Sequence, residues 1–548
     1  MQGHTTSSQA ARLSECFPTA DQIPAEFRVD PRPYERLVLQ GGKLIEWTGP
    51  TTPVSSPICL RQPDGTLQRP VIGQIPNMDE AAALAGLQAA VDAWDHGRGP
   101  WPTMSVAGRI AAIEAFTTRM VAVRDEVVKL LMWEIGKSLD DSRKEFDRTV
   151  EYIRRTVDAL KDMDRANSRF TLDSGVIAQV RRSPLGVCLS MGPFNYPLNE
   201  TYTTLIPAII MGNTVVVKPP KFGALSHQPI LQAFAESFPP GVVNYIYGRG
   251  STIIGPIMQS GKVDALAFIG SSRAANLLKH QHPRPHRLRS ILGLDAKNPA
   301  LVMPDADLDV AVRECVTGAL SFNGQRCTGL KLLFVHESIV EPFLAKLSAA
   351  VEALPIGLPW TKGVKLTPLP EIDKAGSMRA YVDDAAKHGA SIINPSGGAS
   401  SETLYFPSIV YPVAPDAELY TKEQFGPVVP VCSYRDEQDF LDFVVASNYG
   451  QQVSLFGRDP EKIARLIDPL ANQVSRINLN AQCQRGPDTL PFTGRKDSAE
   501  GTLSISDALR CFSIRTLVAA NADSAGREVI QNIVTGRHSC FLHTDFIL

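Results

Sequence analysis

The segment from Phe322 to Thr328 holds the residues whose types and order best suit covalent chemistry. Cys327 directly follows Arg326 and comes three residues after Gly324. A neighbouring cation and helix-end amides lower a thiol pKa below its free value of about 8.5, and the thiolate is the nucleophilic form. Cys327 is therefore a candidate nucleophile. The alternative is a small buried hydrophobe, a common state of free cysteines.

Short β-branched runs separated by helical stretches must position any such site. The expected strands are residues 186–191, 214–220, 243–248 and 265–270. The expected helices are residues 79–97, 105–135, 140–165, 198–210 and 226–238. This alternation predicts βαβ units around a parallel sheet, and it resumes from 299 to about 480. The fold class is therefore α/β with two such domains, preceded by an irregular lead-in with short strands over residues 1–75.

Four candidate binding residues follow the expected strands. Ligands of parallel sheets bind outside the carboxyl ends of the strands. Asn195, Lys218, Gly270 and Ser271 fall at such ends. Gly270 and Ser271 open a helix whose N-terminus could hold a phosphate. An ordinary strand-to-helix turn is the alternative for this pair.

Composition narrows the class of protein. The chain has 548 residues, enough for two or three domains, and its 55 basic and 57 acidic residues give a net charge of −2. That balance argues against a nucleic-acid partner bound by bulk charge. No run of about 20 apolar residues could span a membrane, and the first residues lack the apolar core of a secretory signal. Nine dispersed cysteines without zinc spacing predict a reduced, cytoplasmic protein with no metal site.

Several motifs together resemble the aldehyde dehydrogenase superfamily. In chain order they are GPFNYP, VVKPP, IGSS, GQRCT and EQFGPV. The resemblance covers about residues 35–523 and implies a nicotinamide-binding α/β domain, a catalytic α/β domain and a small oligomerisation β-sheet. It also implies a homodimer or homotetramer. The implied boundaries are a lead-in at 1–60, the nicotinamide-binding domain at 61–296 with an excursion at 165–183 to the oligomerisation sheet, the catalytic domain at 297–505, the oligomerisation strand at 506–523 and a C-terminal extension at 524–548.

The resemblance assigns roles to individual residues. Cys327 would attack an aldehyde carbonyl, and the Asn195 amide and the Cys327 backbone N–H would stabilise the oxyanion. Lys218 would bind the adenine-side ribose and Glu423 the nicotinamide-side ribose, with Phe425 packed by the nicotinamide. Lys221 stands where NAD-preferring relatives often have a Glu, so we expect NADP as cofactor, with NAD possible.

A further segment indicates the substrate. Residues 484–488, with the sequence QRGPD, resemble the non-phosphorylating glyceraldehyde-3-phosphate dehydrogenases. By that resemblance the substrate is a small phosphorylated aldehyde whose phosphate is held by Arg148, Tyr196, Arg326 and Arg485. Planar guanidinium groups suit a phosphate dianion. Surface or structural ion pairing of these arginines is the alternative.

One departure from the family pattern concerns the general base. Gly293 stands where the family has a Glu, in a stretch whose register is fixed by Lys297-Asn298-Pro299. Thioester hydrolysis needs a base, which typically contributes about 10²–10⁴-fold. Asp295, two residues on, is the first candidate to replace it, and another carboxylate is the second. Two further alternatives are acyl transfer to CoA, and a catalytically weakened NADP-binding protein.

Overall fold

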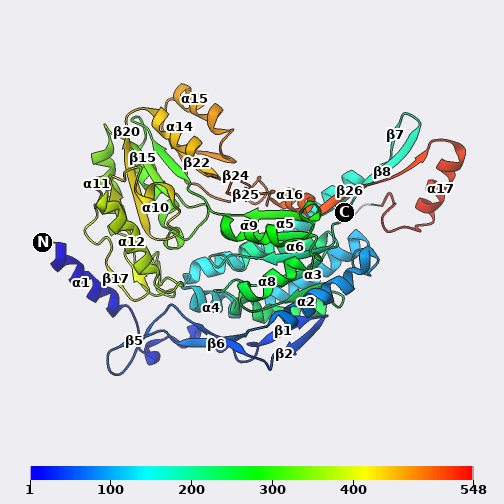
Figure 1. Cartoon of the computed structure of the whole chain (residues 1–548), viewed down its shortest axis with the longest axis horizontal. Helices are drawn as coiled ribbons and strands as arrows, with labels where there is room; N and C mark the ends of the chain where they lie inside the picture. The colour runs from blue at the N-terminus through cyan, green and yellow to red at the C-terminus, as the bar shows by residue number, and fades with distance from the viewer. Residues whose placement is uncertain (1, 546–548) are drawn as a thin grey trace.

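The structure is a computed structural model that describes residues 2–545, with side chains from residue 9 onward (Figure 1). Its first parallel sheet is built from short apolar and β-branched runs that are buried on both faces. The strands, in spatial order, are β11 (Val243–Tyr245), β10 (Thr214–Lys218), β9 (Val187–Met191), β12 (Ala265–Ile269) and β13 (Arg289–Gly293). A two-residue strand, β25 (Ala499–Glu500), joins β13 in antiparallel orientation. The strands begin and end within a few residues of the predicted ranges.

Helices cover this sheet, as predicted for a parallel sheet. They are α2 (Glu80–Trp94), α3 (Val106–Ala122), α4 (Arg124–Ile135), α5 (Leu139–Asn167), α6 (Asn199–Ile210), α7 (Leu231–Ser237), α8 (Gly250–Gln259) and α9 (Ser272–Gln281). The helix expected over 105–135 is two helices, because Val123 leaves the helical conformation with φ −105° and ψ 17°. Part of the helix expected at 226–238 is a 3₁₀ stretch, Leu225–Ile230.

A second, seven-stranded sheet follows in the chain and lies on the other side of the molecule in Figure 1. Its strands, in spatial order, are β16 (Ser391–Ile392), β19 (Ser408–Tyr411), β20 (Val428–Tyr434), β15 (Leu332–His336), β14 (Pro299–Val302), β22 (Gln452–Phe456) and β23 (Arg476–Leu479). All pairs are parallel except β16 with β19. The helices of this part are α10 (Leu308–Leu320), α11 (Val340–Glu352), α12 (Lys374–Lys387), α13 (Glu418–Thr421), α14 (Glu437–Ala446) and α15 (Pro460–Leu470). We propose the domain boundary between β13 and β14, where the chain passes from one sheet to the other.

A three-stranded sheet extends away from the two larger sheets, next to α16 (Ile505–Cys511) (Figure 1). It consists of β26 (Ser513–Asn521), β8 (Val176–Pro184) and β7 (Thr171–Asp173). β26 and β8 pair over nine residues, from Ser513 with Pro184 to Asn521 with Val176. Its outer faces expose the apolar side chains of Leu172, Val176, Ile514 and Leu517.

The lead-in contains more regular structure than the sequence indicated. Residues 2–15 form a helix, α1 (Gln2–Glu15), rather than irregular chain. Its last turn packs on the second sheet's core, where Leu13 is buried, and Gln9 donates to the Ser396 hydroxyl at 2.5 Å. Short strands follow as predicted: β1 (Leu37–Gln40), β2 (Lys43–Glu46), β3 (Thr51–Ser55), β4 (Leu60–Arg61), β5 (Leu67–Gln68) and β6 (Val71–Pro76).

The C-terminal extension folds back onto its own chain. It forms α17 (Ser524–Thr535), and the carbonyl of His543 then accepts hydrogen bonds from Gln179 and Arg181 of β8. The last three residues of the extension, 546–548, lie outside the described part of the chain.

Candidate active site

A distorted turn after α10 presents Cys327. Residues Phe322 and Asn323 adopt positive φ angles of 48° and 55°. Buried hydrogen bonds hold this conformation: Asn323 donates to the carbonyl of Thr367 at 3.0 Å, and Lys331 donates to the carbonyl of Gly324 at 2.9 Å. Positive φ is costly for residues with a side chain and clusters at functional sites.

The loop after β9 lies directly against this turn. The Asn195 side-chain amide donates to the carbonyl of Gln325 at 2.7 Å, and Asn195 is buried. The structure therefore brings together the predicted nucleophile and the predicted oxyanion donor, which are more than 100 residues apart in the sequence.

A buried lysine fixes the Asn195 loop from behind. The Lys137 ammonium donates to the carbonyl of Asn195 at 2.8 Å and to the carboxylate of Glu145. The other oxygen of Glu145 accepts the backbone N–H groups of Leu198 and Asn199 at 3.0 and 3.1 Å. Lys137 also lies 3.6 Å from the centre of the Tyr196 ring. Neither Lys137 nor Glu145 belongs to a motif that indicated function in the sequence.

Cys327 opens into a cavity of about 240 Å³. The four residues predicted to bind a phosphate line the same cavity: Arg148, Tyr196, Arg326 and Arg485. Glu200 also lines it, and sequence reasoning missed this residue. Glu200 lies four residues after Tyr196, on the first turn of α6. Residues one helical turn apart lie on one face, so this spacing could have indicated Glu200 from the sequence.

Two carboxylates partly neutralise the three arginines of this cavity. Arg148 makes a bidentate pair with Asp488, with N–O distances of 2.9 and 2.7 Å. Arg485 pairs with Glu200, and both side chains are buried. Arg326 has no carboxylate partner within residues 9–545; it reaches Thr328, Gln482 and the carbonyl of Cys483 at 3.2–3.5 Å.

The charge balance at Cys327 differs from the sequence expectation of a lowered thiol pKa. Burial raises the pKa of Cys327 to about 11. Glu200 and Glu423 add to this increase, whereas Arg485 and Arg326 oppose it. The neighbouring cation is present as predicted, but it does not outweigh burial and the two carboxylates.

The strand end that lacks the family's Glu has room for a Cβ atom. The three atoms nearest to a Cβ on Gly293 would belong to Ile269 and Leu503, at 3.5–3.6 Å, which is ordinary van der Waals contact. Asp295 lies elsewhere than in the Cys327 cavity. One of its carboxylate oxygens accepts both the backbone N–H and the hydroxyl of Ser272 at 2.8 Å. Asp295 thus caps the start of α9, and this geometry does not support its predicted role as a base.

The same contacts change the interpretation of Gly270 and Ser271. The Gly270 N–H donates to the carbonyl of Gly293 at 3.0 Å, and the Ser271 hydroxyl caps its own helix by accepting from Ala274 at 3.3 Å. The N–H groups of Gly270, Ser272 and Ala274 thus have acceptors, and the phosphate contact of Gly270 and Ser271 stays a prediction.

Lys218 and Lys221 lie at and just beyond the end of β10. Lys218 donates to the carbonyl of Pro219 at 3.0 Å, and burial lowers the pKa of its ammonium to about 8. Lys221 is exposed, with its ammonium 5.0 Å from the centre of the Phe222 ring. Both lysines are thus at the edge of the sheet where ligands of parallel sheets bind.

Glu423 and Phe425 approach the Cys327 region from the second sheet. One oxygen of Glu423 accepts the Ala296 N–H at 3.3 Å, and the other, Oε1, is buried and has no hydrogen-bond partner among the described residues. Burial raises the pKa of Glu423, against the opposing charge of Lys331. The Phe425 ring contacts Phe194 edge-on, with centroids 5.8 Å apart.

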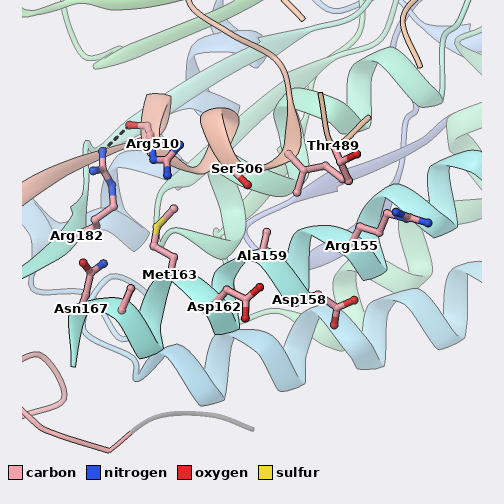
Figure 2. A pocket seen from close by; sticks show the side chains of 12 residues that line it. Arg155, Asp158, Ala159, Asp162, Met163, Asn167, Arg182, Thr489, Ser506 and Arg510 are labelled. Atoms are coloured by element: carbon pink, nitrogen blue, oxygen red, sulfur yellow. Dashed lines mark hydrogen bonds between the residues drawn. The ribbon is translucent and has the colours of Figure 1, made fainter. Parts of the chain in front are cut away.

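A second hollow, of about 530 Å³, lies between α5 and α16 (Figure 2). Figure 2 shows Arg155, Asp158 and Asp162 along α5, facing Ser506 and Arg510 of α16. Its lining residues include no cysteine or histidine, so it lacks the nucleophile of the Cys327 cavity.

In the part of the chain that the structure describes, no group of three or more His, Cys, Asp or Glu side chains is arranged to hold a metal ion. No helix there is long and apolar enough to cross a membrane.

Comparison with known proteins identifies the family. A profile of the aldehyde dehydrogenase family matches residues 62–518. An NADP-dependent glyceraldehyde-3-phosphate dehydrogenase of Streptococcus equinus is 30% identical over 443 residues, which are 79% of this chain and 90% of that protein. A protein of the same name from Zea mays is 29% identical over 442 residues, 78% of this chain and 84% of that protein.

Solved structures agree. The NADP-dependent glyceraldehyde-3-phosphate dehydrogenase of Bacillus halodurans, in complex with NADP, matches with a TM-score of 0.81 and 29% identity, over 89% of this chain and 100% of that one. The predicted α/β fold class is confirmed. The match along most of the chain shows that it belongs to the aldehyde dehydrogenase family and is an enzyme.

Proposed function

We propose that this enzyme oxidises a small phosphorylated aldehyde, glyceraldehyde 3-phosphate, to the corresponding acid, 3-phosphoglycerate, with NADP. The observation that carries this proposal is the cavity in which Cys327 opens onto Arg148, Tyr196, Arg326 and Arg485. Relatives that bear the name NADP-dependent glyceraldehyde-3-phosphate dehydrogenase support the same substrate and cofactor.

The chain's own residues account for the covalent steps. The Cys327 thiolate attacks the aldehyde carbon, a C–S bond forms, and the carbonyl π electrons move to oxygen. Asn195 and the Cys327 backbone N–H donate to that oxyanion, and one such donor is worth about 2.7–4 kcal/mol. The adduct becomes a Cys327 thioester when its former aldehyde carbon loses a hydride and the C=O bond re-forms; NADP, when bound, would be the hydride acceptor. Water then attacks the Cys327 thioester and releases the acid.

The residues present fit the cofactor in part. Glu423 offers a buried oxygen that has no hydrogen bond and lies 3.6 Å from the Lys331 ammonium, and a ribose hydroxyl would satisfy it. Lys218 has a single hydrogen bond, to its neighbour's carbonyl, and retains two N–H donors for the other ribose. Exposed Lys221 offers a positive charge for a 2′-phosphate. Phe425 would pack by the nicotinamide. NADP is therefore the proposed cofactor, and NAD would bind the same residues more weakly.

Arg326 carries the proposed selectivity for phosphate. Arg148 and Arg485 each have a carboxylate partner, so their charges are already balanced. The unpaired Arg326 would make a charge-assisted hydrogen bond, which is about twice as strong as a neutral one. The assay that tests this compares kcat/KM for glyceraldehyde 3-phosphate and for unphosphorylated glyceraldehyde, each with NADP and with NAD. Equal values for the two aldehydes would contradict the phosphate proposal.

Acyl transfer to CoA is a second candidate because Gly293 leaves no side chain at the family's base position. Acyl transfer predicts that the turnover rate depends on added CoA. Hydrolysis predicts the same turnover rate with and without CoA. A catalytically weakened NADP-binding protein would bind the cofactor, measured by fluorescence, without reducing it.

The three-stranded sheet supports a proposal on assembly. Leu172, Val176, Ile514 and Leu517 are apolar and 39–61% exposed. We infer that this sheet pairs with a second copy in a homodimer or homotetramer, in the cytoplasm. Leu517→Arg should lower the mass measured by light scattering, whereas Val529→Arg, at an exposed position on α17, should not. An unchanged mass for Leu517→Arg would contradict this interface.

A further inference from the structure

Hydrolysis of the Cys327 thioester needs a proton acceptor that the chain does not have at its usual place. Gly293 has no side chain, and its neighbours Ile269 and Leu503 are apolar. Water is a poor nucleophile until a base takes its proton, and the base must lie within hydrogen-bond reach of that water. The question is which carboxylate of this chain meets that condition.

Glu200, Asp295 and Glu423 are the carboxylates to compare; Asp488 is set aside because both of its oxygens bind Arg148. Asp295 is bound to the Ser272 N–H and hydroxyl at the start of α9. Glu423 is bound to the Ala296 N–H. Neither lines the cavity into which Cys327 opens. Asp295 would have to leave Ser272 to act on the thioester, and the free oxygen of Glu423 lies 3.6 Å from the Lys331 ammonium, outside this cavity.

Glu200 differs from both in position. It lies on the first turn of α6, where its N–H donates to the Tyr196 carbonyl at 3.1 Å, and it lines the cavity together with Cys327. One carboxylate oxygen, Oε2, pairs with Arg485. No donor among the described residues reaches the other oxygen, Oε1. Glu200 is also the charged group that most raises the pKa of Cys327, consistent with its proximity.

We propose that Glu200 is the general base that hydrolyses the Cys327 thioester, in place of the side chain that Gly293 lacks. This inference rests on the proposed function, because it concerns the second half of that reaction. Oε1 takes a proton from water as the water oxygen bonds to the acyl carbon. The C–S bond then breaks, its electron pair returns to Cys327 as thiolate, and the acid leaves. No oxidation or reduction occurs in this step.

Arg485 is a positioning residue in this scheme. Its bond to Oε2 fixes the plane of the carboxylate and leaves Oε1 as the acceptor.

The test uses an ester, which acylates a nucleophilic thiol without cofactor. With p-nitrophenyl acetate, the wild-type enzyme should release nitrophenolate continuously. Glu200→Gln keeps an oxygen that can accept from Arg485 but cannot take a proton. We expect it to release one equivalent in a burst and then slow by about 10²-fold or more, with one acetyl group on Cys327 in peptide mass analysis. Asp295→Asn is the matched control and should continue to turn over.

A double variant separates loss of a base from loss of structure. Gly293→Glu places a carboxylate where a Cβ atom has room. The double variant Gly293→Glu/Glu200→Gln should have a steady-state rate at least tenfold higher than that of Glu200→Gln alone. An unchanged steady rate in Glu200→Gln would overturn the inference. So would acetyl-enzyme accumulation in wild type or in Asp295→Asn.

Failure of the proposed function would look different from failure of this inference. If the wild type hydrolyses the ester but reduces no NADP with glyceraldehyde 3-phosphate, the proposed substrate or cofactor is wrong, and the burst of Glu200→Gln still supports the base. If the wild type oxidises the aldehyde and Glu200→Gln does so at the same steady rate, the base assignment is wrong alone.

Discussion

Two hollows of this molecule each contain three arginines and nearby carboxylates, but they differ in what surrounds the charges. The hollow of Figure 2 is lined by Arg155, Arg182 and Arg510, and the Cys327 cavity by Arg148, Arg326 and Arg485. In the first, Arg155 and its partner Glu151 are 53% and 51% exposed. In the second, Arg485 and Glu200 are 5% and 9% exposed.

The difference teaches that composition alone does not define a site. The larger hollow has solvated charges and no nucleophile, and Arg182 there donates to the carbonyl groups of Arg510 and Ser513. The smaller cavity encloses its charges next to Cys327, where low dielectric strengthens each interaction. The following substitutions test this contrast, in order of decreasing effect.

Cys327→Ser should have the largest effect. Removing the nucleophile should lower NADPH formation by at least about a thousandfold, as for nucleophiles of other enzymes. The measurement is NADP reduction with glyceraldehyde 3-phosphate. Cys540→Ser, at an exposed position outside both hollows, is the control and should keep wild-type activity. Full activity in Cys327→Ser would show that the cavity is not the catalytic one.

Arg326→Gln should have the next largest effect. It removes the one cavity arginine without a carboxylate partner among the described residues. We expect kcat/KM for glyceraldehyde 3-phosphate to fall about 10–100-fold, the value of a charged hydrogen bond, with little change for glyceraldehyde. Arg155→Gln, in the hollow of Figure 2, should change neither value. Equal losses for both aldehydes in Arg326→Gln would mean that Arg326 does not recognise the phosphate.

Glu200→Gln should change the reactivity of the thiol by a smaller factor. A raised pKa of about 11 means that Cys327 is mostly protonated at pH 8, so its alkylation by iodoacetamide should speed up as the pH rises toward 11. Removing the Glu200 charge leaves Glu423 raising this pKa and Arg326 and Arg485 opposing it. The pKa should then fall, and alkylation at pH 8 should become several-fold faster.

Peptide mass analysis restricts this measurement to Cys327. Asp158→Asn, which removes a carboxylate from the other hollow, should leave the alkylation rate unchanged. A slower alkylation in Glu200→Gln at pH 8 would contradict the charge arrangement described here.

Arg155→Gln should have the smallest effect of all. It breaks an exposed ion pair with Glu151, one helical turn away on α5, so the free energy of unfolding should fall by about 0.3–0.5 kcal/mol. Arg485→Gln breaks a buried pair, and its cost should be about 3–5 kcal/mol. Urea unfolding of both variants measures this difference. Similar decreases in the free energy of unfolding for the two variants would mean that the ion pairs of the two hollows contribute equally to stability.

The residues whose proximity the sequence indicated most directly were those inside contiguous motifs. Arg326 and Cys327 are neighbours, and Asn195 and Tyr196 are neighbours, so the chain itself brings each pair to one place. The partners of the arginines could not be predicted in this way. Arg148 and Asp488 are 340 residues apart, and Arg485 and Glu200 are 285 apart. Only the packing of α5 and α6 against the 484–488 loop brings them together.

Two further features escaped prediction for related reasons. Asp295 caps α9 because β12 and β13 are parallel neighbours, which places the residues after β13 beside the start of α9. The spacing of residues within the motif that contains Asp295 does not indicate this contact. The helix α1 has a polar sequence with few apolar residues, so its sequence shows no helical periodicity of apolar residues. Its last turn contacts the core of the second sheet, which the sequence of α1 does not indicate.

The buried pair of Lys137 and Glu145 has a consequence for how the enzyme loses activity. Lys137 holds the Asn195 carbonyl, and Glu145 holds the Leu198 and Asn199 amides. If this loop opened alone, an enclosed ammonium and carboxylate would lose these partners, at a cost of several kcal/mol. The Leu198 and Asn199 amide protons should therefore exchange with solvent only when α5 itself comes away. On heating, catalysis and the native fold should then be lost together, in a single transition.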